Sequence, residues 1–170
     1  MQTFAISDLS FTYPTETAPA LQNVSLSIEA GSFTVLCGRS GCGKSTLLRQ
    51  LKPILQPHGT KTGEILFDGK PLESLSQREQ SACIGFVLQN LDAQLVTDKV
   101  WHELAFGLES LGCDTPSIRR RVAEMASFFG IQDWFHRKVD ELSGGQKQLL
   151  ALASVMVLQP RLLILDEPTS

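Results

Sequence analysis

The sequence predicts an α/β fold, because segments with the period of strands alternate with segments of helical spacing along the whole chain. Its 170 residues, of which 42% are hydrophobic, suffice for one compact domain with a buried core. A glycine-rich segment at residues 38–45 follows an apolar run and precedes a helical segment. Strand, glycine loop and helix in this order are the context of a phosphate-binding loop.

The N-terminal third predicts three strands and one helix. Apolar and polar residues alternate over 4–13 and 24–28, which is the period of half-buried strands, and 14–19 between them is expected to be a loop. The continuous apolar run 33–37 predicts a strand covered on both faces in a mostly parallel sheet. A helix is expected over 45–51.

The middle of the chain predicts two more strands. Residues 63–69 lie between glycine turns, and residues 84–88 form a buried apolar run. A polar stretch with helical character begins at Leu75 and separates the two strands.

A helical region then begins, with helices expected over 101–108 and 117–129. For the second helix, Thr115 is expected to be the N-cap, with Pro116 at the first helical position. Gly130 is expected to end it.

The C-terminal part predicts a third helix and a last strand. Ser143 is expected to cap the helix, which runs through Val157 and stops before Pro160. Residues 162–165 are expected to form a buried strand that ends at an acidic pair.

Charge and apolar patterning exclude several classes of function. The net charge is -3 with acids and bases mixed, which argues against a broad nucleic-acid footprint or a polybasic membrane anchor. The N-terminus lacks the pattern of a signal peptide, and the longest apolar run, 149–158, is about half a membrane span. The four cysteines show no C-x-x-C pairing. We therefore expect a soluble, cytoplasmic protein with reduced thiols.

The glycine-rich segment fits the pattern G-x-x-x-x-G-K-[ST]. Its glycines let backbone N–H groups turn toward phosphate oxygens, and the following helix adds its positive end. Lys44 is expected to reach the β- and γ-phosphates, and the Ser45 hydroxyl to hold Mg²⁺. A dinucleotide loop read from Gly41 fails because Thr46 stands where the last glycine is required. The candidate phosphate site is Gly38, Arg39, Ser40, Gly41, Cys42, Gly43, Lys44, Ser45 and Thr46.

Hydrolysis needs a second anchor for the metal and a group that acts on the attacking water. Asp166, at the end of an apolar run, is expected to meet Mg²⁺ through water. Glu167 beside it is expected to be the general base. In isolation this pair would be interpreted as an ordinary acidic turn.

A second glycine motif occurs as Leu-Ser-Gly-Gly-Gln at residues 142–146, before the last predicted helix. The Ser143 side chain and the two glycine amides predict another anion-binding helix start. Taken by itself, this motif is equally well a capped turn.

The glycine loop, the Leu-Ser-Gly-Gly-Gln motif and the Leu-Leu-Ile-Leu-Asp-Glu-Pro motif, in this order and spacing, resemble the nucleotide-binding domain of ABC ATPases over essentially the whole chain. The resemblance implies a P-loop NTPase core with a mostly parallel sheet, N-terminal antiparallel β strands and an inserted helical subdomain. The core would comprise residues 1–89 and 146–170, and the helical subdomain residues 90–145.

The resemblance also implies roles for further residues, with ATP and Mg²⁺ as cofactors. Tyr13 matches the aromatic residue that stacks on adenine, and Gln89 matches the glutamine that links Mg²⁺ to the helical subdomain. Two such domains pair head to tail. The motif residues that would bind the γ-phosphate held by the partner are Ser143, Gly144, Gly145 and Gln146.

Residues 89–107 are similar to the ATPases of energy-coupling-factor and cobalt-type importers, although Leu91 replaces the proline usual there. The resemblance implies an ATP-hydrolysing importer subunit, peripheral on the cytoplasmic face of the membrane. Its partners would be a second ABC ATPase, in a homo- or heterodimer, and an integral membrane transporter subunit. No nucleic-acid partner is expected.

The family also has a switch histidine beyond the acidic pair, and His58, His102 and His136 do not occupy that position. We interpret these three as surface or helix residues. We therefore expect a C-terminally truncated chain that binds ATP better than it turns it over. Two alternatives remain open: a soluble ABC ATPase that acts on ribosomes or DNA, and a nucleotide-binding fragment without turnover.

Overall fold

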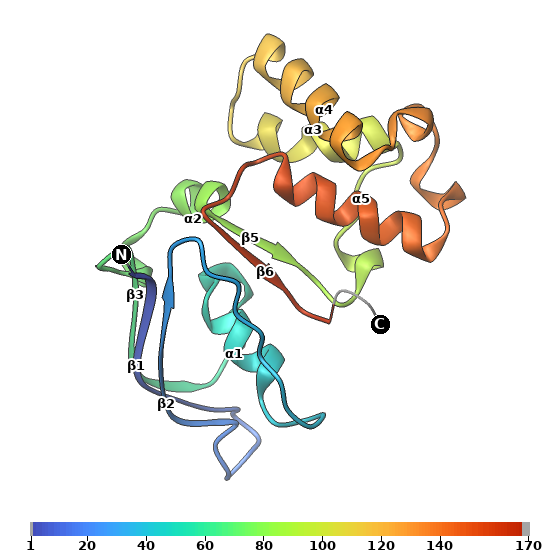
Figure 1. Cartoon of the computed structure of the whole chain (residues 1–170). Helices are drawn as coiled ribbons and strands as arrows, with labels where there is room; N and C mark the ends of the chain where they lie inside the picture. Colours follow the sequence, from blue (N-terminus) through green and yellow to red (C-terminus); the bar gives the residue numbers. More distant parts are fainter. Residues whose placement is uncertain (1, 168–170) are drawn as a thin grey trace. The chain divides into compact units, whose positions relative to one another are not determined.

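A computed structural model describes residues 2–167 of the chain. The chain divides into two compact units, one up to Gln80 and one from Ser81 onward, and each is described by itself. Figure 1 shows the course of the chain through both units.

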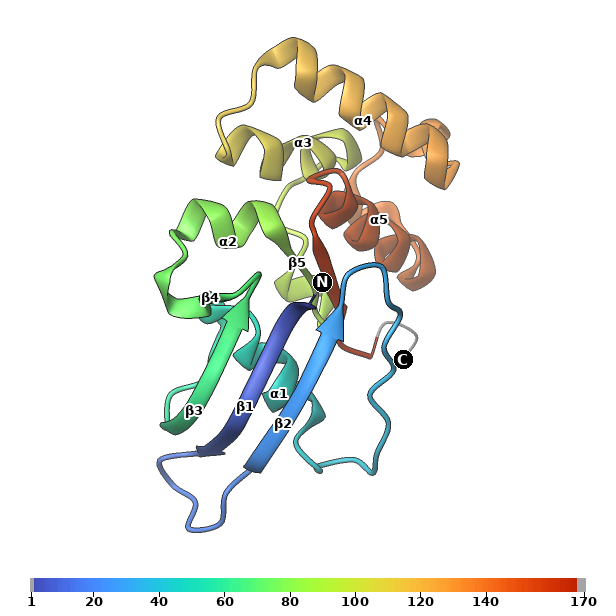
Figure 2. The same cartoon turned by 60° about the vertical axis from the view of Figure 1, so that its left-hand side comes forward.

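The first unit is built on an antiparallel sheet. Its strands are β1 (Gln2–Thr12), β2 (Leu21–Glu29), β3 (Thr60–Phe67) and β4 (Lys70–Pro71), in the order β2-β1-β3-β4. β1, β2 and β3 lie side by side in Figure 2. The strands predicted from alternation over 4–13 and 24–28, and from glycine turns over 63–69, are confirmed, and so is the antiparallel N-terminal arrangement.

The buried side chains of β1 change parity along the strand. Phe4 and Ile6 are buried, and then Leu9 and Phe11 are buried, so the period of two is broken once between them. The break coincides with Asp8, whose φ is 49°, and with a register shift against both neighbouring strands. A β-bulge inserts one residue and thereby reverses which residues, odd- or even-numbered, point to a given face of the sheet. Even-numbered residues before the bulge and odd-numbered residues after it therefore both point into the core.

The strand predicted at residues 33–37 is absent, and this prediction was wrong. The chain has no regular structure from 32 to 39, and Phe33 and Val35 are 90% and 66% exposed. A strand is held by backbone hydrogen bonds to a neighbouring strand. Within residues 2–167 no strand pairs with this run. Apolar composition alone therefore does not order it.

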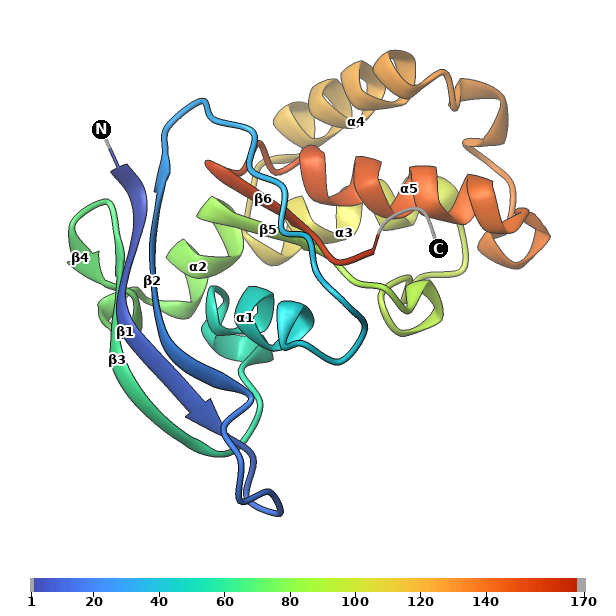
Figure 3. The same cartoon turned by 60° about the horizontal axis from the view of Figure 1, so that its bottom comes forward.

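The helical segments of the first unit follow the glycine loop and β4. The predicted helix at 45–51 is α1 (Lys44–Gln50), whose buried residues include Leu47, and it lies along one face of the sheet (Figure 3). The polar stretch from Leu75 forms α2 (Gln77–Cys83), as predicted. Two short 3-10 helices complete the unit, η1 (Pro53–Leu55) and η2 (Leu72–Ser74).

The second unit combines a parallel strand pair with three helices. β5 (Ile84–Val87) pairs in parallel with β6 (Leu162–Leu165). The expected parallel sheet is thus represented by two strands in the part of the chain described. The helices are α3 (Val100–Ser110), α4 (Thr115–Phe129) and α5 (Gly144–Met156), and the 3-10 helices are η3 (Leu91–Ala93), η4 (Gln132–Trp134) and η5 (Val139–Glu141).

The three helices share one apolar core, which holds them together through burial of nonpolar surface. Its buried members include Leu104 and Leu108 of α3, Val122 and Ala126 of α4, Leu150 and Ala153 of α5, and Val157 directly after α5. None of the helices within residues 2–167 is long and apolar enough to cross a membrane.

The start of α4 differs by one residue from the prediction. Asp114, not Thr115, is the N-cap, and its side chain accepts a hydrogen bond from the Ser117 backbone N–H at 2.9 Å. That backbone donor holds the pKa of the Asp114 carboxyl below its usual value. Helix α4 begins at Thr115, which puts Pro116 at its second position. Gly130 ends the helix in the left-handed region, as predicted.

Gly85 lets α5 and the loop after it pack directly against β5. A Cβ atom on Gly85 would lie 2.5 Å from Val155 Cγ1 and 2.9 Å from Pro160 Cγ. Contacts this short require neighbouring atoms to move.

We predict that Gly85→Ala lowers the free energy of unfolding by about 1–3 kcal/mol, because it overpacks this contact. Urea denaturation measures the change. Gly144→Ala is the matched control, because a Cβ there meets no atom within 4 Å. Equal stability of Gly85→Ala and the parent would contradict the packing described.

Candidate functional site

The glycine loop of the first unit forms a tight turn before α1. The Cys42 N–H donates to the Arg39 carbonyl at 3.3 Å. Gly41 and Gly43 have φ values of 78° and 94°, a region that side chains other than glycine rarely adopt. A Cβ on Gly43 would also lie 2.6 Å from the Ala20 carbonyl oxygen. Only glycine fits this position, so the loop's shape is fixed by its sequence.

Lys44 lies over the same loop. Its Nζ donates to the carbonyl oxygens of Gly38 and Arg39, at 3.1 Å each. The loop residues 38–42 are exposed. The structure therefore places the ammonium of Lys44, the first residue of α1, beside the exposed turn. A cation next to a glycine turn at a helix start is an arrangement that favours anions.

Tyr13 is hydrogen-bonded to a side chain of α1. Its hydroxyl and the Thr46 hydroxyl are 3.0 Å apart and hydrogen-bonded, and its ring meets the Phe11 ring edge to face at 4.9 Å between centroids. Thr46 is buried. The aromatic ring predicted to stack on adenine is thus anchored next to the helix that follows the glycine loop.

In the second unit, the ends of β5 and β6 bring the polar residues together. Val87 pairs with Leu165, and the Asp166 N–H donates to the Val87 carbonyl at 3.1 Å. Asp166 is 2% exposed. Because the strands are parallel, the residues that follow them leave the sheet at the same edge.

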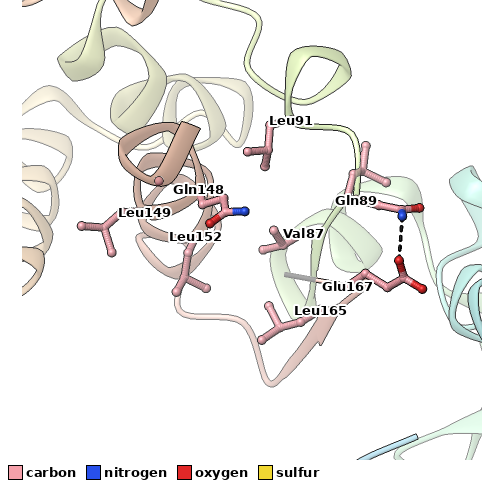
Figure 4. A pocket seen from close by; sticks show the side chains of 10 residues that line it. Val87, Gln89, Leu91, Gln148, Leu149, Leu152, Leu165 and Glu167 are labelled. Atoms are coloured by element: carbon pink, nitrogen blue, oxygen red, sulfur yellow. Dashed lines mark hydrogen bonds between the residues drawn. The ribbon is translucent and has the colours of Figure 1, made fainter. Parts of the chain in front are cut away.

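Two residues beyond the last strand pair, the side chains of Gln89 and Glu167 are in contact. The Gln89 Nε2 donates to Glu167 Oε2 at 2.7 Å, between residues 78 positions apart (Figure 4). The sequence predicted both as site residues but did not predict this contact. Glu167 has a φ of 51°, which is uncommon for a residue other than glycine.

Beside this pair is a cavity of about 190 Å³. Figure 4 shows it between α5, which carries Leu149 and Leu152, and the ends of the strand pair, which carry Val87 and Leu165. Glu167 lies at its edge together with Gln89. Glu167 therefore has apolar side chains on one side of it.

The segment 143–146 forms the start of α5, as predicted. The Ser143 side chain accepts from the Gln146 N–H at 3.4 Å, and the Gln146 side chain accepts from the Ser143 N–H at 2.9 Å. This reciprocal pair is a capping box.

Gly144 and Gly145 have no structural reason to be glycine within the described chain. Neither has a positive φ, and a Cβ on either would meet no atom within 4 Å. Both are exposed. Packing within residues 2–167 therefore leaves these two positions open for alanine, unlike Gly43 and Gly85.

The metal ligands predicted from the sequence are Ser45 in the first unit and Gln89 and Asp166 in the second. No group of three or more His, Cys, Asp or Glu side chains in residues 2–167 could hold a metal ion. The predicted set supplies one hydroxyl, one amide and one carboxylate. Mg²⁺ is usually held by one or two carboxylates together with substrate phosphates. Each of the three side chains thus offers an oxygen atom of the kind that Mg²⁺ accepts.

Sequence reasoning missed two residues that support the site. Gln94 Oε1 accepts from the Leu88 N–H at 2.7 Å and so holds the end of β5. Glu103, 5% exposed on α3, accepts from the Val96 and Thr97 N–H groups at 3.1 and 2.9 Å. A charged residue on the apolar face of a helix was the available signal for Glu103.

The histidines lie outside these clusters. His58 and His136 are exposed, and His102 Nδ1 is 3.1 Å from Asp98 Oδ1 on the surface of α3. This agrees with their interpretation as surface or helix residues.

Known sequences provide an independent comparison. A putative ABC transporter ATP-binding protein of Bacillus cereus is 50% identical over 165 residues, which are 97% of this chain and 30% of that protein. The energy-coupling factor transporter ATP-binding protein EcfA of Syntrophomonas wolfei is 40% identical over 169 residues, 98% of this chain and 60% of that protein. The chain thus spans about a third of the length of the first of these relatives.

Solved structures agree with the sequence comparison. The structure of cbiO1 from Clostridium perfringens, described as part of the ABC transporter complex cbiONQ, superposes with a TM-score of 0.84 at 33% identity, over 99% of this chain and 66% of that one. A dimeric post-hydrolysis structure of the ATP-binding cassette MJ0796, bound to ADP and Pi, gives a TM-score of 0.81 at 26% identity, over 98% and 74% of the two chains. The ABC transporter family profile matches residues 21–170. The chain therefore belongs to the ABC transporter family, and its fold is that of the family's ATP-binding domain.

Proposed function

We propose that this chain binds and hydrolyses ATP with Mg²⁺ as the motor subunit of an ABC importer. The observation that carries the proposal is the glycine loop, where two left-handed glycines and the Lys44 ammonium surround one exposed turn. A triphosphate is the anion that such a loop fits. The family membership supports the same conclusion.

Within the proposed site each residue has a distinct task. Residues 38–46 hold the phosphates, and Lys44 leaves the loop carbonyls to pair with the β- and γ-phosphate oxygens. Ser45, Gln89 and Asp166 would hold Mg²⁺, which supplies charge neutralisation at the transferred phosphoryl group. Glu167 accepts a proton from the attacking water.

The contact between Tyr13 and Thr46 supports the proposed role of Tyr13 in nucleotide binding. Its hydroxyl is held by Thr46 of α1, so the ring is oriented before any ligand binds. An aromatic face fixed in this way offers a stacking surface for adenine.

A second ATPase subunit would complete each site. Gly144 and Gly145 are exposed at a helix start, where bare backbone N–H groups and the helix dipole attract anions. Since nothing within the described chain requires glycine there, close approach of a ligand from outside explains both. The γ-phosphate held by a partner subunit is the proposed ligand.

The importer assignment rests on the relatives named for energy-coupling-factor transport and on the cbiO1 structure. It implies an integral membrane subunit as the second partner and a location on the cytoplasmic face of the membrane. The proposed division into an ATPase core, 1–89 and 146–170, and a helical subdomain, 90–145, would make the helical part the contact with that membrane subunit.

We predict that Lys44→Ala weakens Mg-ATP binding by at least about tenfold, because the lost contacts are charge-assisted hydrogen bonds. Isothermal titration calorimetry measures the affinity. Lys70→Ala in β4 is the matched control and should bind as the parent does. Equal affinity of Lys44→Ala and the parent would show that the phosphate site lies elsewhere.

We predict that Tyr13→Ala weakens ATP binding about tenfold or more, because base stacking on an aromatic ring contributes about 1–3 kcal/mol. Tyr13→Phe keeps the ring but loses the bond to Thr46, so it should weaken binding only about threefold. The same titration, with Phe128→Ala as an exposed aromatic control, tests this. The stacking role fails if Tyr13→Ala binds ATP like the parent.

We predict that Gly144→Ala and Gly145→Ala leave stability within about 0.5 kcal/mol of the parent, because both sites are open. Turnover by the full-length protein should nevertheless fall by about tenfold or more, since a methyl group would hold the partner's phosphate away from the backbone. Thermal denaturation and phosphate release measure the two effects. Undiminished turnover in both variants would exclude this role.

A further inference from the structure

We propose that Gln89 is a positioning residue for Glu167, holding the acid's carboxylate with its amide nitrogen while presenting its amide oxygen to the metal. This inference rests on the proposed function, in which Glu167 acts on the attacking water. It adds a second task to Gln89 beyond that of a metal ligand, and it links the two tasks through one amide group.

The strand register brings the two residues together. Val87 of β5 is level with Leu165 of β6, and the ladder continues with the bond from the Asp166 N–H to the Val87 carbonyl. Gln89 and Glu167 each lie two residues beyond this last pair. The two side chains therefore lie at the same level beyond the paired strands, where they form a 2.7 Å hydrogen bond.

The chemistry of the contact fixes which end of the amide faces the acid. An ionised carboxylate only accepts hydrogen bonds, so the NH₂ group of Gln89 must face Glu167. The amide oxygen then lies on the other side of the group, where it is available to a cation. A cation bound to that oxygen would polarise the amide and strengthen its N–H donor to Glu167.

Two contacts hold the segment around Gln89, and one of them is made with α5. Gln94 holds the Leu88 N–H at 2.7 Å, and Asp92 forms an ion pair with Lys147 of α5 at 3.2 Å. The bond to the Leu88 N–H holds the backbone just before Gln89, and the exposed ion pair adds a weak link to α5 after it. A donor held in this way limits the orientations open to the carboxylate, as positioning of a catalytic group requires.

Gln89→Glu separates the two tasks. It keeps an oxygen for the metal but replaces the N–H donor that faces Glu167 with a second acceptor, because a carboxylate cannot donate a hydrogen bond. Turnover by Gln89→Glu should therefore fall although an oxygen for the metal remains. Gln89→Ala lacks both the donor and the oxygen.

The experiment compares Mg-ATP affinity and ATP hydrolysis of the full-length parent, Gln89→Glu, Gln89→Ala and Asn90→Asp at one neutral pH. Asn90→Asp is the matched control, because it adds the same charge one residue away, where the side chain accepts from the Asp92 N–H instead. We expect the kcat of Gln89→Glu to fall about tenfold or more while its Mg-ATP affinity stays within about threefold of the parent, since the lost donor acts on the attacking step. Asn90→Asp should keep the parent's kcat. A kcat of Gln89→Glu equal to the parent's would overturn the inference.

A second readout does not depend on turnover. The side-chain amide of Gln89, observed by ¹H–¹⁵N NMR in nucleotide-free protein, should shift when Glu167→Ala removes the acceptor. An unchanged signal would overturn the positioning contact even if the parent hydrolyses ATP. A shifted signal in a parent without hydrolysis would instead overturn the proposed function and leave the contact standing.

Discussion

The parallel pairing of β5 with β6 is the constraint on which the candidate catalytic residues depend. Parallel strands leave a sheet at the same edge, so residues 78 positions apart in sequence arrive at one level. A shift of one residue in this register would separate Gln89 from Glu167. It would also turn alternate side chains to the other face of the pair. The short, fully buried β5 and the close packing of α5 on Gly85 hold the register in place.

The glycines of this chain differ in whether packing within the chain requires a residue without a side chain. At Gly43 and Gly85, atoms of the chain itself exclude a side chain, so the fold accounts for the residue. At Gly144 and Gly145 the space is open among residues 2–167, so packing of the chain on itself does not account for these two glycines. This contrast supports the proposal that another subunit completes the site.

Much of the secondary structure could be predicted from local patterns, because helix caps, strand alternation and glycine turns act within a few residues. The motif residues were recognised for the same reason, since phosphate binding needs particular residue types at fixed spacing. The failures had nonlocal causes. Residues 33–37 have the composition of a strand but lack a partner strand among residues 2–167, and the bulge at Asp8 depends on pairing with two neighbours. The contact between Gln89 and Glu167 could not be predicted because strand register decides it.

The glycine loop at residues 38–46 is proposed to recognise a chain of phosphates rather than a base or sugar. Calorimetric affinities for ATP, ADP and AMP, measured with Mg²⁺ under one set of conditions, test this claim most directly. The loop's donors and the Lys44 ammonium are expected to act on the β- and γ-phosphates, so AMP should bind at least about a hundredfold more weakly than ATP. Equal affinities for AMP and ATP would contradict the claim, because the binding energy would then come from the nucleoside.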